Sequence, residues 1–169
     1  MWKEIVEYFE DSPQRLRVAQ AIIRHGFRVE APGVIKCRAI RVPLKAIGEA
    51  LGIDRRTVQM TTERICANSR LRDFFSRLEP AGVSLENVRK VLGYGCVTIY
   101  VDAPENPGIV SEVTTTIASH RIAIRQVIAE DAAIYEEPCL KVLTTTPLPG
   151  EVIQELTVIS GVKKVIIEQ

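Results

Sequence analysis

The chain has 169 residues, of which 46% are hydrophobic and 25% are charged. This composition is typical of one globular domain or two small ones, and it excludes wholesale disorder. No apolar run approaches the roughly 18–20 residues that span a bilayer, and no stretch resembles a signal peptide. We therefore expect a cytoplasmic protein that does not enter a membrane.

The net charge of +1 conceals two halves of opposite sign. Residues 1–93 contain 17 Lys and Arg against 11 Asp and Glu, whereas residues 94–169 contain 5 against 10. This asymmetry suggests that the first half binds polyanions and that the second half has a different task.

The beginning of the chain predicts a helix followed by a small hairpin or wing. Ser12-Pro13 offers a capping hydroxyl and a proline at the first helical position, and Gly26 favours a stop. A turn signal, Ala31-Pro32-Gly33, then separates the stretches 27–29 and 34–42.

Residues 43–65 are typical of a helix-turn-helix. Gly48 would let the two helices approach closely, and Gly52 permits the positive φ of a tight turn. Ile53 would fill the turn, and Asp54 would cap the next helix. Apolar, small or hydroxyl residues recur at helical spacing on the faces expected to point inward: Leu44, Ile47, Gly48, Leu51, Val58, Thr62 and Ile65.

The second helix of this motif would present a face suited to the major groove of double-stranded DNA. Arg can bind guanine O6 and N7, and Gln can bind adenine N6 and N7. The expected outward residues are Arg55, Arg56, Gln59, Met60 and Glu63. The expected phosphate contacts are Lys45, Arg64, Arg70 and Arg72. The alternative is an ordinary helical hairpin with a solvated charged face.

After residue 93 the pattern becomes one of strands and helices in the order β-α-β-β-α-β, which is ferredoxin-like. The expected strands are 97–101, 122–129, 138–144 and 162–167, with helices at 107–120 and 149–159. Residues 84–92 indicate a short connecting helix or linker. We therefore expect an α+β protein with a helix-turn-helix domain at 1–93 and a second domain at 94–169.

The turn after the first of these strands has the chemistry of a ligand site. Gly108 lets a ligand approach the backbone, and the free N–H groups of the helix that follows favour a carboxylate. Asn106 offers an amide that both donates and accepts hydrogen bonds. The alternative is a Pro-Gly turn that merely starts a helix.

This turn and the order of elements resemble the ACT domain, a small regulatory module that binds amino acids. The resemblance covers residues 96–169, and the Asn106-Pro107-Gly108 turn is its most specific element. Ile122-Ala123-Ile124 resembles the start of the family's second strand, although Ala123 stands where the family often has Asn. The resemblance implies an amino-acid effector, pairing of ACT domains into at least a homodimer, and a pocket formed by Asp102, Asn106, Pro107, Gly108, Ile109, Ala123 and Ile124.

The whole chain resembles predicted archaeal regulators of amino-acid metabolism that join a helix-turn-helix to an ACT domain. Residues 52–58, Gly-Ile-Asp-Arg-Arg-Thr-Val, carry this resemblance in the N-terminal half. It implies a ligand-responsive transcription regulator. The alternative is a regulatory subunit that does not bind DNA, in which the basic half docks a protein partner and the second domain senses a metabolite.

Catalysis has little support in the sequence. No nucleophile elbow, zinc-protease motif, P-loop or dinucleotide fingerprint is present. The four cysteines, Cys37, Cys66, Cys96 and Cys139, are scattered without a C-x-x-C pair, and only His25 and His120 could add imidazole ligands. We expect no catalytic residue, no metal and no cofactor.

Overall fold

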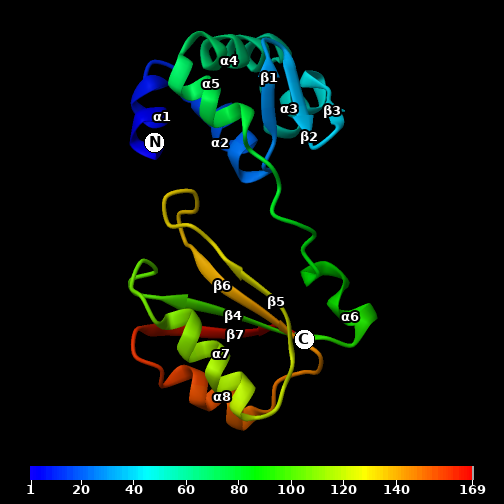
Figure 1. Ribbon diagram of the computed structural model, residues 1–169, viewed down its shortest axis with the longest axis vertical. Coiled ribbons are helices and arrows are strands. Elements are labelled where there is room, and N and C mark those ends of the chain that lie inside the picture. The colour runs from blue at the N-terminus through cyan, green and yellow to red at the C-terminus, as the bar shows by residue number, and fades with distance from the viewer. Residues whose placement is uncertain (169) are drawn as a thin grey trace. The chain divides into compact units, whose positions relative to one another are not determined.

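The computed structural model describes residues 1–168, and its contacts divide the chain into two compact units (Figure 1). The first unit is Met1–Gly82, and the second begins at Val83. The sequence placed this boundary after residue 93. The division lies earlier because residues 83–92 bond to the sheet of the second unit.

Within residues 1–82, five α-helices surround a three-stranded antiparallel sheet in the order β1-β2-β3. The elements are α1 (Trp2–Tyr8), α2 (Pro13–Arg24), β1 (Arg28–Ala31), β2 (Val34–Cys37), β3 (Ile40–Val42), α3 (Leu44–Leu51), α4 (Arg55–Ala67) and α5 (Ser69–Ser76). Their shared core includes Val18, Ile22, Ile35, Val58, Ile65, Leu71 and Phe75. Helices α1 and α5 were not anticipated from the sequence.

Two local expectations in this unit need correction. Pro13 does begin α2, but the Ser12 side chain makes no capping hydrogen bond. The stretch 34–42 forms two strands, because the chain turns between them at Arg38 with a φ of 53°. This is the left-handed region, which favours glycine. Because Arg38 occupies this position in place of glycine or asparagine, the turn could not be recognised from the sequence.

The expected helix-turn-helix is confirmed as α3, a turn and α4. Gly52 ends α3 with a φ of 63°, and the Asp54 carboxylate accepts a hydrogen bond of 2.7 Å from the Arg56 backbone N–H at the start of α4. Ile53 is buried between them. A Cβ on Gly48 would lie 2.6 Å from the Ile53 carbonyl oxygen, so the helices can meet at this distance only with glycine there.

A buried hydroxyl fixes the small sheet to α4. The Thr62 side chain donates to the Gln59 carbonyl at 2.7 Å and accepts from the Gly33 backbone N–H at 2.8 Å. Thr62 is fully buried, and both capacities of its hydroxyl are used. The β1–β2 turn is therefore held against the helix that carries the exposed arginines.

The second unit is confirmed as ferredoxin-like, with its four strands antiparallel in the order β5-β6-β4-β7. The elements described here are η1 (Glu86–Val88), α6 (Arg89–Leu92), β4 (Gly95–Val101), α7 (Ile109–Ser119), β5 (Ile124–Ala129), β6 (Cys139–Thr144), α8 (Gly150–Thr157) and β7 (Val162–Glu168). No helix in residues 1–168 is both long and apolar enough to cross a membrane.

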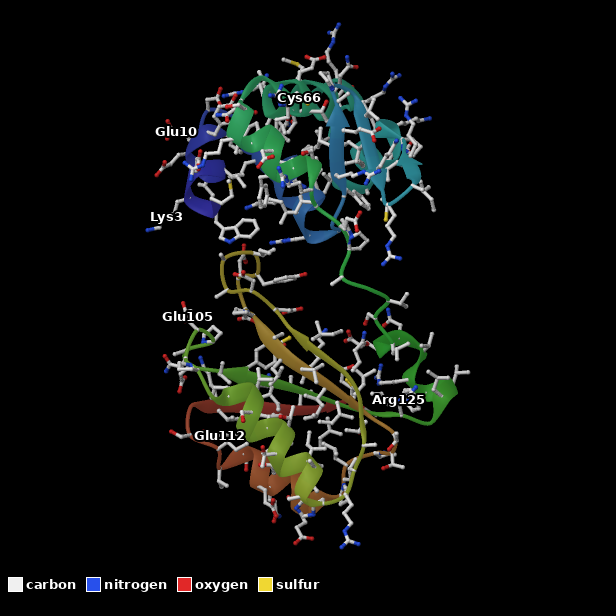
Figure 2. The ribbon with its side chains drawn as sticks, in the orientation of Figure 1. Lys3, Glu10, Cys66, Glu105, Glu112 and Arg125 are labelled. Carbon is white, nitrogen blue, oxygen red and sulfur yellow. The ribbon has the colours of Figure 1, made fainter. Side chains whose placement is uncertain are left out.

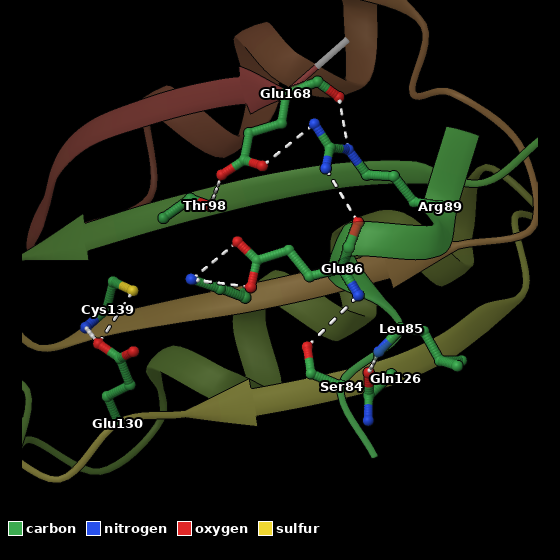
Figure 3. A network of polar contacts seen from close by, with 10 residues as sticks. Ser84, Leu85, Glu86, Arg89, Thr98, Gln126, Glu130, Cys139 and Glu168 are labelled. Carbon is green, nitrogen blue, oxygen red and sulfur yellow. Dashed lines mark hydrogen bonds and ion pairs between the residues drawn. The ribbon is translucent and has the colours of Figure 1, made fainter. Parts of the chain in front are cut away.

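The two faces of this sheet differ in chemistry. Helices α7 and α8 lie side by side over one face (Figure 1), where Val97, Ile99, Val142, Val113, Ile117, Val152 and Leu156 form the second core. The opposite face carries polar side chains, among them Thr98, Gln126 and Lys141, which bond to Glu168 and to residues 83–86 (Figure 3). One face of the sheet is therefore covered by apolar packing, and the other face is held by hydrogen bonds and ion pairs.

Replacing Gly48 by Ala should destabilise the first unit by about 1–3 kcal/mol, because the added methyl meets backbone that cannot move without shifting α4. The fluorescence of the single tryptophan reports the unfolding of this unit, since Trp2 packs edge-on against Phe74 with ring centroids 5.6 Å apart. Urea unfolding followed by its fluorescence measures the change. The matched control is Gly52→Asn, where a side chain meets nothing within 4 Å and Asn tolerates the left-handed backbone. Equal losses in both variants would contradict the assigned role of Gly48.

Candidate functional site

The exposed face of α4 carries most of the residues expected to contact DNA. Arg55, Arg56, Gln59 and Glu63 are all exposed, as the spacing predicted. Gln59 donates its amide N–H to the Glu63 carboxylate at 3.0 Å, one turn away. Within residues 1–168, neither the Arg55 nor the Arg56 guanidinium makes an ion pair. Both are therefore available to an anionic partner.

Lys45 also lies on the surface of this motif. It is exposed on the first turn of α3 and makes a long ion pair of 3.6 Å with Glu49. An exposed i,i+4 pair of this kind contributes little to stability, so the ammonium can exchange Glu49 for a phosphate at small cost.

Arg64 occupies a different position from the one expected, because its guanidinium points back into the first unit. It pairs with both oxygens of Asp11 at 2.7 and 2.9 Å and donates to the Tyr8 carbonyl at 2.9 Å. The guanidinium also lies over the rings of Tyr8 and Phe9. The hydrogen bonds to Asp11 raise the pKa of Arg64 above its ordinary value. Arg64 thus joins α4 to α1 rather than presenting a free charge.

The two remaining candidates for phosphate contact also differ. Arg70 pairs with Glu4 at 3.3 Å, whereas Arg72 is exposed and has no ion pair within the described residues. Charge alone did not separate the engaged arginines from the free ones.

The Asn106–Ile109 turn borders a cavity of about 190 Å³ in the second unit. Gly108 has a φ of 109°, a backbone conformation that L side chains rarely adopt, and it caps α7. No side chain of the described residues caps the first N–H groups of α7, so they have no intrahelical partner beside this turn. The cavity is lined by Asn106, Pro107, Gly108, Ile109, Glu130 and Cys139, together with neighbouring apolar residues.

The other expected pocket residues lie elsewhere. Asp102 borders an adjoining, larger cavity of about 680 Å³ with Tyr100, Lys163 and Lys164. Ile124 pairs with Thr144, and Ala129 pairs with Leu140, so the start of β5 lies at the opposite end of the sheet from the end that borders the cavity. Ala123 precedes that distant end. One chain thus does not bring Ala123 and Ile124 to the Asn-Pro-Gly turn.

Glu130 and Cys139 are cavity residues that the sequence did not reveal. The Cys139 thiol and backbone N–H both donate to one Glu130 oxygen at 3.2 Å (Figure 3). Burial, and then the hydrogen bond to Glu130, raise the pKa of Cys139 to about 12. The thiol therefore stays protonated near neutral pH and acts as a donor, which places a partly buried carboxylate at the cavity wall.

The charges around the turn suit a zwitterion better than a simple anion. The start of α7 carries roughly half a positive charge, which favours a carboxylate. Glu105, in the preceding loop, and Glu112, on α7, are exposed at the same end (Figure 2), and Glu130 lines the cavity. These carboxylates favour an ammonium group. No cluster of His, Cys, Asp and Glu suited to a metal ion occurs in residues 1–168.

Comparison with known proteins gives little guidance. No family model matches the chain, and no curated protein matches it. Among solved structures, the crystal structure of PH0061 aligns over 92% of this chain and 89% of its own, with 12% sequence identity and a TM-score of 0.26. That similarity is too low to support an argument about function.

Replacing Arg64 by Met should destabilise the first unit by about 1–2 kcal/mol. The change removes an ion pair with both oxygens of Asp11 and a hydrogen bond to the Tyr8 carbonyl, at a partly exposed site. The matched control, Arg56→Met, removes an exposed arginine from the same helix whose side chain makes no hydrogen bond or ion pair within residues 1–168, and should change stability by less than about 0.5 kcal/mol. Urea unfolding monitored by Trp2 fluorescence measures both. Equal effects would show that Arg64 is as free as Arg56.

Proposed function

We propose that this protein is a ligand-responsive transcription regulator of amino-acid metabolism that binds double-stranded DNA through α4. The observation that carries the proposal is the helix-turn-helix geometry, in which a glycine contact and a capped turn present Arg55, Arg56 and Gln59 on one exposed face. The charge supports it as well. Residues 1–82 hold 15 Lys and Arg against 10 Asp and Glu, whereas residues 83–169 hold 7 against 11.

In this proposal, side chains of α4 read the bases, and side chains of α3 and α5 bind the phosphates. Arg55 and Gln59 lie one helical turn apart and can each make two hydrogen bonds to a base edge. The Gln59 amide is already held by Glu63, which limits its rotation before DNA arrives. Lys45 and Arg72 supply charge to phosphates, which fixes orientation without reading sequence.

The second unit would sense a small effector, and an α-amino acid fits the charges best. Its carboxylate would meet the N–H groups at the start of α7, and its ammonium would lie near Glu130 or Glu105. Asn106 is exposed and its side chain makes no hydrogen bond within the described residues, so it is free to orient the ligand.

A complete effector site would need a second copy of the chain, since Ala123 and Ile124 lie at the far end of the sheet. A homodimer or higher homo-oligomer would bring the start of one β5 to the turn of its partner. Exposed apolar side chains support such pairing: Val110 on α7 and Val127 on β5. Two-fold symmetry would also match a palindromic DNA site.

The proposed readers of DNA can be separated from residues that only bind phosphate. Arg55→Ala and Gln59→Ala should each lower discrimination between specific and random DNA by about 1–3 kcal/mol. Lys45→Ala should weaken binding to all DNA sequences alike and reduce the slope of log K against log salt by roughly 0.9. Binding to selected and random duplexes across a salt series measures both effects. Unchanged specificity in both Arg55→Ala and Gln59→Ala would contradict the assignment. Binding of a protein partner by the first unit, without binding of DNA at low salt, would favour the alternative of a regulatory subunit.

The effector site is tested by calorimetry with the twenty amino acids, first on the wild-type chain. Asn106→Ala should lower the affinity of the amino acid that binds by roughly ten- to a hundredfold, the loss of one hydrogen bond to a charged group. Gln154→Ala removes an exposed amide on α8, outside this cavity, and is the matched control. Light scattering on the same samples should show at least a dimer at micromolar concentration. If no amino acid binds, or if Asn106→Ala binds normally, the effector belongs to another class or another site.

A further inference from the structure

Residues 83–92, which we call the strap, lie along the polar face of the second unit's sheet. One glutamine on β5 holds the beginning of the strap at two points. The Gln126 amide donates to the Val83 carbonyl at 2.7 Å, and its oxygen accepts from the Leu85 backbone N–H at 2.9 Å. These two bonds reproduce the donor and acceptor pattern of a neighbouring strand.

Two ion pairs continue this attachment across the sheet (Figure 3). Lys141 on β6 donates to both oxygens of Glu86 at 2.9 and 3.0 Å, and Arg89 pairs with Glu168 on β7 at 3.3 Å. Partial burial, the largest single influence, opposes the charge of Lys141, but the hydrogen bonds to Glu86 and the negative charge around the ammonium together outweigh it and raise the pKa of Lys141. The strap therefore contacts three of the four strands through polar groups.

Apolar packing contributes little to this attachment. Four of the five large apolar side chains of the strap are exposed, with exposed fractions of 77% for Val83, 44% for Val88, 89% for Val91 and 46% for Leu92, and only Leu85 is partly buried. The four side chains of its two ion pairs, two from the strap and two from the sheet, are between 15% and 28% exposed, so the pairs are partly buried but still reach water and salt. A segment held mainly by partly accessible polar contacts, with a single partly buried apolar side chain, can detach without unfolding the core.

The chain just before the strap is fixed to the first unit. Leu78 packs against the first core, and the backbone of Glu79 and Pro80 lies so close to Gly26 that a Cβ there would be 2.6 Å from the Pro80 nitrogen. Only Ala81 and Gly82 separate Pro80 from Val83, the first residue held by the sheet. The docked strap therefore leaves two unattached residues between the units.

The strands that hold the strap also border the effector cavity. Lys141 lies two residues from Cys139 on β6, so the two side chains point to the same face of the sheet. Gln126 lies on β5, which leads directly into Glu130. A ligand that shifts Glu130 or Cys139 thus acts on the two strands that carry Gln126 and Lys141.

The geometry points to a releasable strap in which Glu86, Arg89 and Gln126 are positioning residues that set the length of the tether between the two units. This inference extends the proposed function, because in a dimer the tether length decides which spacings between DNA half-sites both first units can reach. Release would lengthen the tether from residues 81–82 to residues 81–92, which span up to about 40 Å when extended. A docked strap would restrict the dimer to a narrow range of spacings, and release would widen it.

The docking step is tested on the full chain without DNA. The double variant Glu86→Gln/Arg89→Gln keeps the net charge and removes both ion pairs. Hydrogen exchange across residues 83–92 should become several-fold faster, while β4 and β6 stay protected. Small-angle scattering should show a larger radius of gyration. The control Lys90→Gln/Glu151→Gln makes the same charge changes at exposed residues that have no ion pair in the described part of the chain, and it should behave as wild type.

A charge-reversed pair checks that the effect comes from the contact itself. Glu86→Lys alone should release the strap, and Glu86→Lys with Lys141→Glu should restore slow exchange. The proposal of a releasable strap is overturned if residues 83–92 of the double variant exchange as slowly as in wild type. It is also overturned if wild-type residues 83–92 exchange as fast as a free peptide.

The consequence for DNA is measured separately with duplexes in which two half-sites, selected from random DNA, are separated by spacers varied one base pair at a time. The double variant should accept a broader range of spacers than wild type, with unchanged preference within each half-site. Faster exchange with an unchanged spacer range would overturn the positioning role. A wild-type chain that selects no DNA would instead refute the regulator function, whereas the exchange and scattering results would still decide whether the strap docks.

Discussion

The contact between Gly48 and the backbone of Ile53 is the constraint on which the first unit depends. At that point α3 and the following turn approach closer than any side chain permits. The turn can then be completed by Gly52 in the left-handed region and by the Asp54 cap on α4. The direction of α4 follows from this contact, and so does the face on which Arg55, Arg56 and Gln59 appear. A steric requirement at one glycine thereby determines which charges the unit offers to a partner.

The second unit meets a different constraint, because α7 and α8 cover only one face of its small sheet. The covered face is apolar and packs against α7 and α8, whereas the other face carries Thr98, Gln126 and Lys141. Buried or partly buried polar groups require partners, and residues 83–92 supply those of Gln126 and Lys141. The connecting segment is thus part of the second unit's structure. Its attachment is weaker than that of the core, since it rests on hydrogen bonds and ion pairs that solvent can reach.

The cations of this protein fall into two groups that have the same sequence signature. Arg55 and Arg56 are exposed and make no ion pair in the described part of the chain, and these groups support the proposed contact with DNA. Arg64, Arg89 and Lys141 are engaged with carboxylates inside their own units. The distinction affects function, because an engaged cation stabilises the fold while a free one can attract phosphate. It also explains why a count of charges along the chain indicated a basic half but could not identify the binding residues.

The sequence by itself determined the elements whose signals are local. The Gly52 turn, the Asp54 cap and the apolar spacing of 44–65 predicted the helix-turn-helix, and period-two strands separated by helical stretches predicted the ferredoxin-like order, because caps, turns and periodicity act within a few residues. Only the tertiary structure decided the rest. It directed Arg64 toward Asp11, joined Glu130 to Cys139, and placed Ile124 at the far end of the sheet from Asn106. It also attached residues 83–92 to the sheet through Gln126 and Lys141, which lie about 40 and 55 residues away in the sequence. Such contacts depend on which distant side chains the fold brings together, and no local pattern records them.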